Sequence, residues 1–286
     1  MPEGHTIHRL AADHRERFEG RKVRATSPQG KFSDGAALVS GHPLSTAEAH
    51  GKHLFLGFAE TGWIHIHLGL FGKVAFGGTP APPPTDTVRL RLATPTAYMD
   101  LRGPTTCALI TDEEKQAIHA RLGPDPLRPR GEGNDPEAAW RRISRSRTTV
   151  AALLLDQKVV AGVGNVYRAE VLFRHGIDPY TPGKDLTYAQ WTAIWADLVD
   201  LMREGVRHNR IDTVRPEHTP EAMGRPPRVD DHGGEVYVYR RARQACHICG
   251  GGGGGGAPPP PPPPPREGAR APPRPPPHTH HPPARP

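Results

Sequence analysis

The composition of the C-terminal end is the strongest constraint on the fold of this 286-residue chain. Seven consecutive glycines occupy positions 250–256, and after one alanine eight prolines follow at 258–265, ahead of a stretch rich in Pro, Arg and His. A segment with almost no apolar side chains cannot build a packed core, so we expect residues 251–286 to be disordered or locally polyproline II. Folded structure is therefore expected within the first 250 residues, a length sufficient for two domains.

Two different periodicities divide these 250 residues. After a helix expected over residues 5–18, short β-like runs between residues 21 and 110 are separated by Gly and Pro clusters, as in a sandwich or flattened barrel. From residue 136 onward, apolar residues recur at spacings of three and four, which is typical of helices. The sequence therefore predicts a multidomain α and β protein, with an N-terminal β-sandwich and its leading helix at 1–121, a linker rich in Pro and Gly at 122–136 and a helical domain at 137–234.

Charge, cysteine content and hydropathy indicate the kind of partner and the compartment. The formal net charge is +7 and the isoelectric point is near 9.6, which favours a polyanion such as nucleic acid, because Lys and Arg side chains release counterions from phosphates. Three cysteines cannot form the disulfide framework of a secreted protein. The sequence has neither a long apolar run nor the apolar segment of a signal peptide, so we expect no membrane partner and a cytoplasmic location.

The most specific motif of the chain lies between two helical patterns, at residues 157–173. Its glycines Gly162 and Gly164 precede a helix start, where backbone N–H groups can approach a phosphate closely and the helix N-terminus favours a negative charge. Asn165 can add a side-chain donor. The pattern predicts a phosphate contact, with an ordinary Gly-containing turn as the alternative.

This string, QKVVAGVGNVYRAEVLF, closely resembles the helix-two-turn-helix of the formamidopyrimidine-DNA glycosylase and endonuclease VIII family. The resemblance covers roughly residues 1–250 in the family's order. It implies a helix-two-turn-helix domain within 137–234 and a truncated, incomplete zinc-finger hairpin at 235–250. The other matching motifs are Met1-Pro2-Glu3 with Gly4, Gly51-Lys52-His53-Leu54, the string HLGLFG at 67–72, Asp125-Pro126-Leu127 and Cys246-His247-Ile248-Cys249.

The resemblance implies a bifunctional DNA glycosylase and abasic-site lyase of base excision repair, a monomer whose partner is damaged double-stranded DNA in the bacterial nucleoid. Removal of Met1 would leave Pro2 with a secondary α-amine, and a reference pKa of about 8 keeps part of it nucleophilic at neutral pH. Pro2 would attack C1′ of the damaged nucleotide and form a Schiff base. Glu3 would transfer protons, and Lys52 would contact the phosphate beside the lesion and assist proton transfer. The alternative for Glu3 and Lys52 is a solvated surface side chain.

The resemblance also implies which residues grip the DNA. Leu70 and Phe71 match the family's void-filling loop, since an apolar wedge can fill the gap that a flipped base leaves in the stack. Their glycine neighbours favour an exposed loop tip over the alternative, a place in the core. Gly164 and Asn165 match the phosphate-binding position of the helical motif.

The family binds zinc through four cysteines in a β-hairpin, so zinc is expected, but this chain supplies only two of the four ligands. Cys246 and Cys249 follow a β-like run at 235–241, whereas glycines and prolines occupy the stretch in which the second pair and an Arg are expected. Two thiolates do not close a tetrahedral site, and a redox pair is the alternative. His65 and His67 have no evident third ligand, so we expect a sheet-surface pair rather than a metal site.

Two points about function stay open at the level of sequence. The endonuclease VIII-like start favours oxidised pyrimidines as substrates, with oxidised purines as the alternative, because the lesion pocket is made by loops whose shape the sequence does not reveal. The incomplete zinc-binding element also suggests a second function, that of a non-catalytic or lyase-only protein that binds damaged DNA.

Overall fold

The computed structural model describes residues 2–229 and 234–251 of the chain. Residues 252–286 of the tail lie outside the described residues. The structure therefore does not test the expectation that the tail is disordered. The described residues belong to one compact unit. Among the described helices, none combines the length and the apolar character that crossing a membrane requires.

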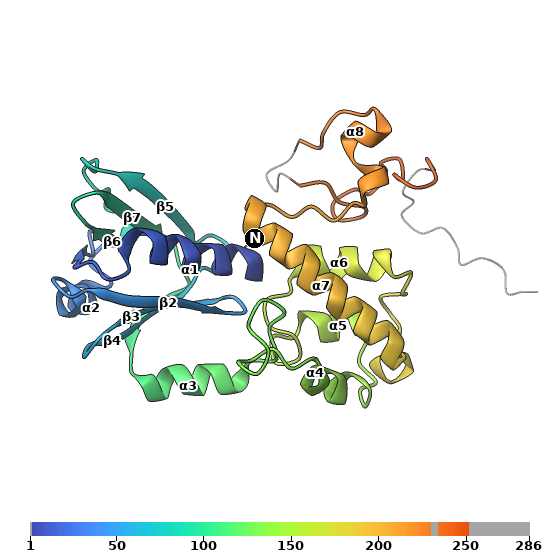
Figure 1. The fold of residues 1–286 in the computed structure, drawn as a ribbon, viewed down its shortest axis with the longest axis horizontal. Helices are drawn as coiled ribbons and strands as arrows, with labels where there is room; N and C mark the ends of the chain where they lie inside the picture. The colour runs from blue at the N-terminus through green and yellow to red at the C-terminus, as the bar shows by residue number, and fades with distance from the viewer. Residues whose placement is uncertain (1, 230–233, 252–286) are drawn as a thin grey trace, which may run out of the picture. The chain divides into compact units, whose positions relative to one another are not determined.

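Two four-stranded antiparallel sheets build the N-terminal half (Figure 1). One sheet has the strand order β1-β6-β7-β5 and the other β2-β3-β4-β8. Helix α1 (Gly4–Phe18) precedes both sheets, α2 (Ser33–Val39) follows β1, and α3 (Asp112–Arg121) follows β8. The predicted β-sandwich with a leading helix is thereby confirmed. The strands are β1 (Arg24–Thr26), β2 (Leu44–His50), β3 (His53–Phe58), β4 (Gly62–His67), β5 (Lys73–Gly78), β6 (Val88–Ala93), β7 (Ala97–Arg102) and β8 (Thr106–Ile110).

Alternating apolar side chains of the strands form the N-terminal core. Leu54 and Leu56 of β3 are fully buried, as are Ile64 and Ile66 of β4, and they cluster with Phe18 of α1. Residues two apart in a strand share one face, so each of these strands contributes every second side chain to the cluster. This packing holds α1 against the sheet and fixes the place at which the chain begins.

Four helices surround the second core. Tyr167 and Trp191 are fully buried within it, and Thr187 begins the longest helix with a capping box. Helix α1 packs against α7 as well as against β2 and β3, so it connects the two halves. The predicted helical region is confirmed, while the domain limits 1–121, 122–136 and 137–234 stay predictions. The helices are α4 (Pro136–Ile143), α5 (Val150–Leu155), α6 (Asn165–Arg174) and α7 (Tyr188–His208), with a 3-10 turn η1 (Gly183–Asp185) before α7.

After α7 the chain is mostly irregular, with a 3-10 turn η2 (Pro216–His218) and helix α8 (Pro220–Met223). The β-like run expected at 235–241 forms no strand in the described segment 234–251. Its successive backbone N–H groups at 237–239 all donate to the carboxylate of Glu170 on α6. N–H groups in a strand alternate in direction, so this interaction and a strand exclude one another. Contact with α6 therefore takes the place of the expected hairpin here.

Candidate active site

The carboxyl group of Glu3 occupies the N-terminus of helix α6. Its side chain is fully buried and accepts hydrogen bonds from the backbone N–H groups of Gly164 (2.8 Å), Val166 (2.8 Å) and Tyr167 (3.4 Å). A helix leaves its first N–H groups without partners inside the helix, and an acidic side chain satisfies them well. The start of the chain is thus anchored to the helix-two-turn-helix motif.

This arrangement bears on the phosphate contact expected for Gly164, which stays a prediction. The N–H group of Gly164 and those of Val166 and Tyr167 donate to Glu3. A Cβ atom at Gly164 would lie 2.4 Å from Cδ of Glu3, so the position needs glycine to admit the carboxyl group. Asn165, the first residue of α6, lies beside this contact, and its expected phosphate contact stays a prediction.

Glu3 and Lys52 have pKa values shifted towards each other. Burial raises the pKa of Glu3 above its ordinary value, although the three N–H groups and the charge of Lys52 oppose the rise. Burial lowers the pKa of Lys52, and the charge of Glu3 opposes that shift. Desolvation prevails in both groups because it disfavours the charged form of each. An acid that holds its proton more tightly beside an amine that loses it more readily is suited to proton transfer.

A close backbone contact brings the start of the chain and the turn of Lys52 to the same segment. Lys52 and Gly51 form the turn between β2 and β3, and Gly51 has a positive φ of 57°. A Cβ atom at Gly51 would lie 2.9 Å from Cβ of Ala161. On the other side, Gly4 donates its N–H to the carbonyl of Gly162 over 2.8 Å. Residues 161–162 therefore contact two segments. One is Gly4, directly after Glu3, and the other is the turn that carries Lys52.

Asp125 is a residue to which reasoning from the sequence assigned no role, although it belongs to a matching motif. Its side chain is fully buried, and Oδ2 accepts the N–H of Gly51 (2.7 Å) and Nε2 of His8 on α1 (2.8 Å). Oδ1 accepts the N–H of Leu127 over 2.8 Å. Burial raises the pKa of this carboxyl group, but His8 and the backbone donors outweigh burial and hold the pKa below its ordinary value. The matching Asp-Pro-Leu string was the signal that could have drawn attention to it.

The loop between β4 and β5 presents two large apolar side chains to solvent. Leu70 is 62% exposed and Phe71 is 81% exposed. The loop turns at Gly69, whose φ is +65°. Neither side chain belongs to a core, as the glycine-flanked pattern predicted, and such exposure is available to a wedge that enters a DNA stack.

His65 and His67 lie on β4 beside His53 of β3. Nδ1 of His53 is 2.8 Å from Nε2 of His65, and their rings stack. Burial lowers the pKa of His53 to about 3 and that of His65 to about 4. The surface position expected for the pair is wrong for His65, whose side chain is buried. The pair is part of a row of three neighbouring histidines, and His53 was missed.

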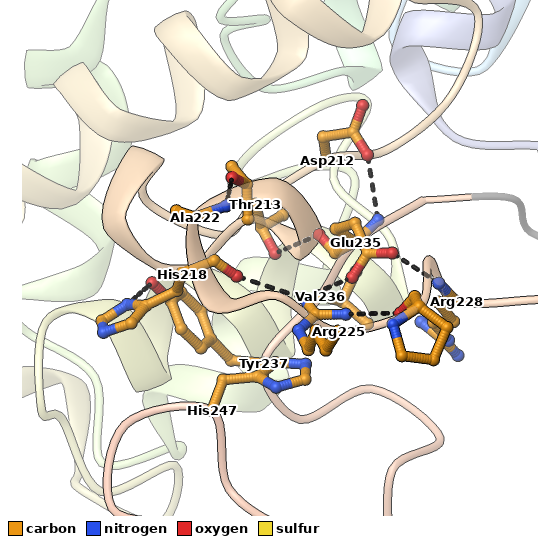
Figure 2. Close-up of polar contacts among 12 residues, drawn as sticks. Asp212, Thr213, His218, Ala222, Arg225, Arg228, Glu235, Val236, Tyr237 and His247 are labelled. Carbon is orange, nitrogen blue, oxygen red and sulfur yellow. Dashed lines mark hydrogen bonds and ion pairs between the residues drawn. The ribbon is translucent and has the colours of Figure 1, made fainter.

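The C-terminal segment is held by carboxylates. Glu170 accepts the N–H groups of Tyr237 (2.6 Å), Val238 (2.8 Å) and Tyr239 (2.8 Å) and the hydroxyl of Thr213 (2.7 Å). Figure 2 shows the neighbouring network, in which the carboxylate of Glu235 binds the Arg225 guanidinium over 2.7 Å and the N–H of Arg228 over 2.5 Å. These contacts join the loop after α7 to residues 234–239 without a metal ligand.

Cys246 and Cys249 lie in a turn after this network. The N–H of Gly250 donates to the carbonyl of Cys246 over 2.9 Å, and the N–H of Ile248 lies 3.4 Å from its sulfur. The described residues contain no group of three or more His, Cys, Asp or Glu side chains placed to hold a metal ion. This donor set does not fit a four-coordinate structural zinc, and no step proposed below relies on a metal.

Comparison with known proteins identifies the class of protein that combines this β-sandwich with this helical motif. The formamidopyrimidine-DNA glycosylase N-terminal domain matches residues 1–107, and the formamidopyrimidine-DNA glycosylase H2TH domain matches residues 122–215. The chain is 48% identical over 254 residues to "Endonuclease 8 1" of Mycobacterium tuberculosis (strain CDC 1551 / Oshkosh), which covers 87% of this chain and 92% of the relative. It belongs to the formamidopyrimidine-DNA glycosylase and endonuclease VIII family, whose members are DNA glycosylases.

More distant relatives agree with this assignment. A formamidopyrimidine-DNA glycosylase of Desulfitobacterium hafniense (strain DSM 10664 / DCB-2) is 29% identical over 87% of this chain and 91% of the relative. A solved structure of the Lactococcus lactis formamidopyrimidine-DNA glycosylase, bound to DNA with an abasic site, has a TM-score of 0.67 at 19% identity. It covers 87% of this chain and 92% of that chain, and it supports the fold.

Proposed function

We propose that this DNA glycosylase is bifunctional: it removes oxidised bases, with pyrimidines favoured, from damaged double-stranded DNA and then cleaves the strand through a Schiff base at Pro2. The buried carboxyl group of Glu3, directly after Pro2, is the observation that carries the proposal. Support comes from the 48% identity to a protein named "Endonuclease 8 1" and from the match of the N-terminal family domain from residue 1. As a monomer acting on DNA, the enzyme would work in the bacterial nucleoid.

The chemistry follows from a secondary amine beside a proton donor. After removal of Met1, the lone pair of the Pro2 nitrogen forms a bond to C1′ while the bond to the base breaks. The base leaves with the electrons of the broken bond and takes up a proton, and the Pro2 nitrogen loses its own N–H proton. Glu3 then protonates O4′ as the C1′–O4′ bond opens, which yields an iminium ion. The iminium acidifies the C2′ protons, so one of them passes to the Glu3 carboxylate, and the electrons of the broken C–H bond expel the 3′ phosphate and cut the strand.

Lys52 and the exposed loop assist in different ways. Lys52 has a lowered pKa and interacts with the charge of Glu3, so it is suited to a phosphate contact beside the lesion and to proton transfer. Leu70 and Phe71 extend into solvent and would fill the gap left by the flipped base.

Borohydride trapping on DNA with a preformed abasic site tests the role of Pro2. Borohydride reduces the iminium to an amine and leaves a covalent protein–DNA adduct. We expect an adduct with the processed wild-type protein, and none with an N-terminal extension that blocks the amine or with Pro2→Gly. An adduct that survives both changes would remove Pro2 from its role.

The two cysteines without a second pair favour one further candidate, a lyase-only or non-catalytic protein that binds damaged DNA. Single-turnover excision separates the candidates. Release of an oxidised pyrimidine from duplex DNA supports the bifunctional enzyme, trapping without release supports the lyase alone, and binding without either supports the non-catalytic protein.

A further inference from the structure

We propose that Asp125 is a positioning residue that fixes the Lys52 turn relative to helix α1. The inference rests on the proposed function of Lys52 and Glu3, and it concerns the contact that gives both residues their places. Asp125 touches no reacting atom in this account. It acts through the backbone of the turn and through His8.

Three segments meet at the Asp125 carboxylate. The N–H of Gly51 comes from the β2–β3 turn (2.7 Å), Nε2 of His8 comes from α1 (2.8 Å) and the N–H of Leu127 follows Asp125 itself (2.8 Å). Gly51 and His8 share the same oxygen, Oδ2. One buried oxygen therefore ties the turn of Lys52 to the helix that begins directly after Glu3.

The turn has little freedom to move once this bond is made. Gly51 is fixed on one side by Asp125, and on the other side it packs so closely against Ala161 that a Cβ atom would lie 2.9 Å away. Lys52 is the next residue, so its direction follows from these two contacts. Helix α1 is a rigid element, and His8 lies about one turn after Gly4, next to Glu3. A shift at Asp125 would therefore change the separation of Lys52 and Glu3.

Only a carboxylate satisfies this set of neighbours. Two backbone N–H groups and one histidine nitrogen converge on its two oxygens. An asparagine has one acceptor oxygen and one NH₂ group. In either orientation its NH₂ group would face a backbone N–H, that of Gly51 or that of Leu127, and two donors cannot form a hydrogen bond. An unsatisfied buried donor costs about 1–3 kcal/mol, enough to displace the β2–β3 turn. Asp125→Asn preserves the size of the side chain but can no longer accept all three hydrogen bonds.

The experiment compares Asp125→Asn with Asp100→Asn, a matched change of a buried aspartate that binds Arg91 and Arg102 in the other sheet. We expect Asp125→Asn to reduce base excision by about 100-fold, the order expected when a group is misplaced by about 1 Å. Trapping on preformed abasic DNA should fall much less. Asp100→Asn should retain wild-type excision at a temperature where it is folded.

A double-mutant cycle shows whether Asp125 acts through Lys52. Excision by Asp125→Asn combined with Lys52→Ala should fall within about twofold of Lys52→Ala alone, since independent sites would instead multiply their losses. Wild-type excision by folded Asp125→Asn, or multiplied losses in the double variant, would overturn the proposal.

The pKa of Lys52 provides a readout that does not depend on the Schiff base, so failure of the proposed function and failure of this inference give different results. NMR of the protein with methylated lysines should show a lowered pKa for Lys52 in the wild type and a return towards the ordinary value in Asp125→Asn. His8→Leu removes one of the donors to Asp125 and should shift the pKa of Lys52 in the same direction. This variant replaces Asp125→Asn in the experiment if Asp125→Asn does not fold. An unchanged Lys52 pKa in the folded variant would refute the positioning role.

Discussion

Replacing Glu170 by alanine is expected to release the C-terminal segment from α6. The carboxylate accepts three backbone N–H groups, at residues 237–239, and the hydroxyl of Thr213. The contact of the Tyr237 N–H is buried, and those of Val238 and Tyr239 are partly buried. An unpartnered buried N–H costs about 1–3 kcal/mol and a partly buried one less, so the loss is at most about 9 kcal/mol. A whole domain is stable by only about 5–15 kcal/mol, so the segment should detach locally instead of remaining in place.

Hydrogen exchange measures this release directly. We expect the amides of Tyr237, Val238 and Tyr239 to exchange at least about 100-fold faster in Glu170→Ala, which corresponds to about 2.7 kcal/mol of lost protection. Glu170→Gln is the matched control. Its oxygen can still accept the N–H groups of Val238 and Tyr239, which share Oε1, while Tyr237 loses its acceptor Oε2, so protection should be intermediate. Wild-type protection in the alanine variant, or release of the wild-type segment by a chelator alone, would refute the reasoning.

Four further outcomes are expected. Lys52→Ala should weaken base excision more than cleavage of preformed abasic sites, because base release needs more proton transfer; equal losses would indicate a general binding role. Asn165→Ala should lower DNA affinity and make its salt dependence shallower by roughly one phosphate contact, and an unchanged slope would argue against that contact. Burial lowers the pKa of His53, His65 and His119 to about 3, 4 and 4. The unfolded chain then binds more protons below its histidine pKa of about 6.5, so stability should be lost as the pH falls from about 6.5 towards 4, and a denaturation midpoint independent of pH would contradict this. Elemental analysis of the purified chain should find less than one zinc per molecule; one tightly bound zinc would contradict the donor count.

The fold could be predicted largely from local patterns. The β-like runs expected between residues 21 and 110 correspond to strands β1 to β8, and the helical spacing expected from residue 136 onward corresponds to α4, α5, α6 and α7. These patterns are local because a strand or helix exposes one face to a core, and the spacing of apolar residues records that face. The exception is the run at 235–241, where a contact with a distant acid overrides the local preference for a strand.

The candidate site could be predicted only in part, because its contacts join residues far apart in the chain. Glu3 binds Gly164 across 161 positions, and Asp125 binds Gly51 across 74. The sequence indicated that a glycine at 164 lets an anion approach the start of a helix. The sequence could not indicate that the anion is Glu3, because a phosphate would accept hydrogen bonds from the same backbone N–H groups.

Helix α6 explains why the incomplete zinc-binding element and the candidate active site are separable. Its first turn receives Glu3, and Glu170, five residues after Asn165, receives the C-terminal segment. Both contacts are made by residues before position 240, whereas the two cysteines lie after it. Within the described residues, therefore, the missing ligand pair does not alter the hydrogen bonds that fix Glu3, Asp125 or Glu170. The residues proposed to transfer protons and the two cysteines therefore lie in different parts of the described chain.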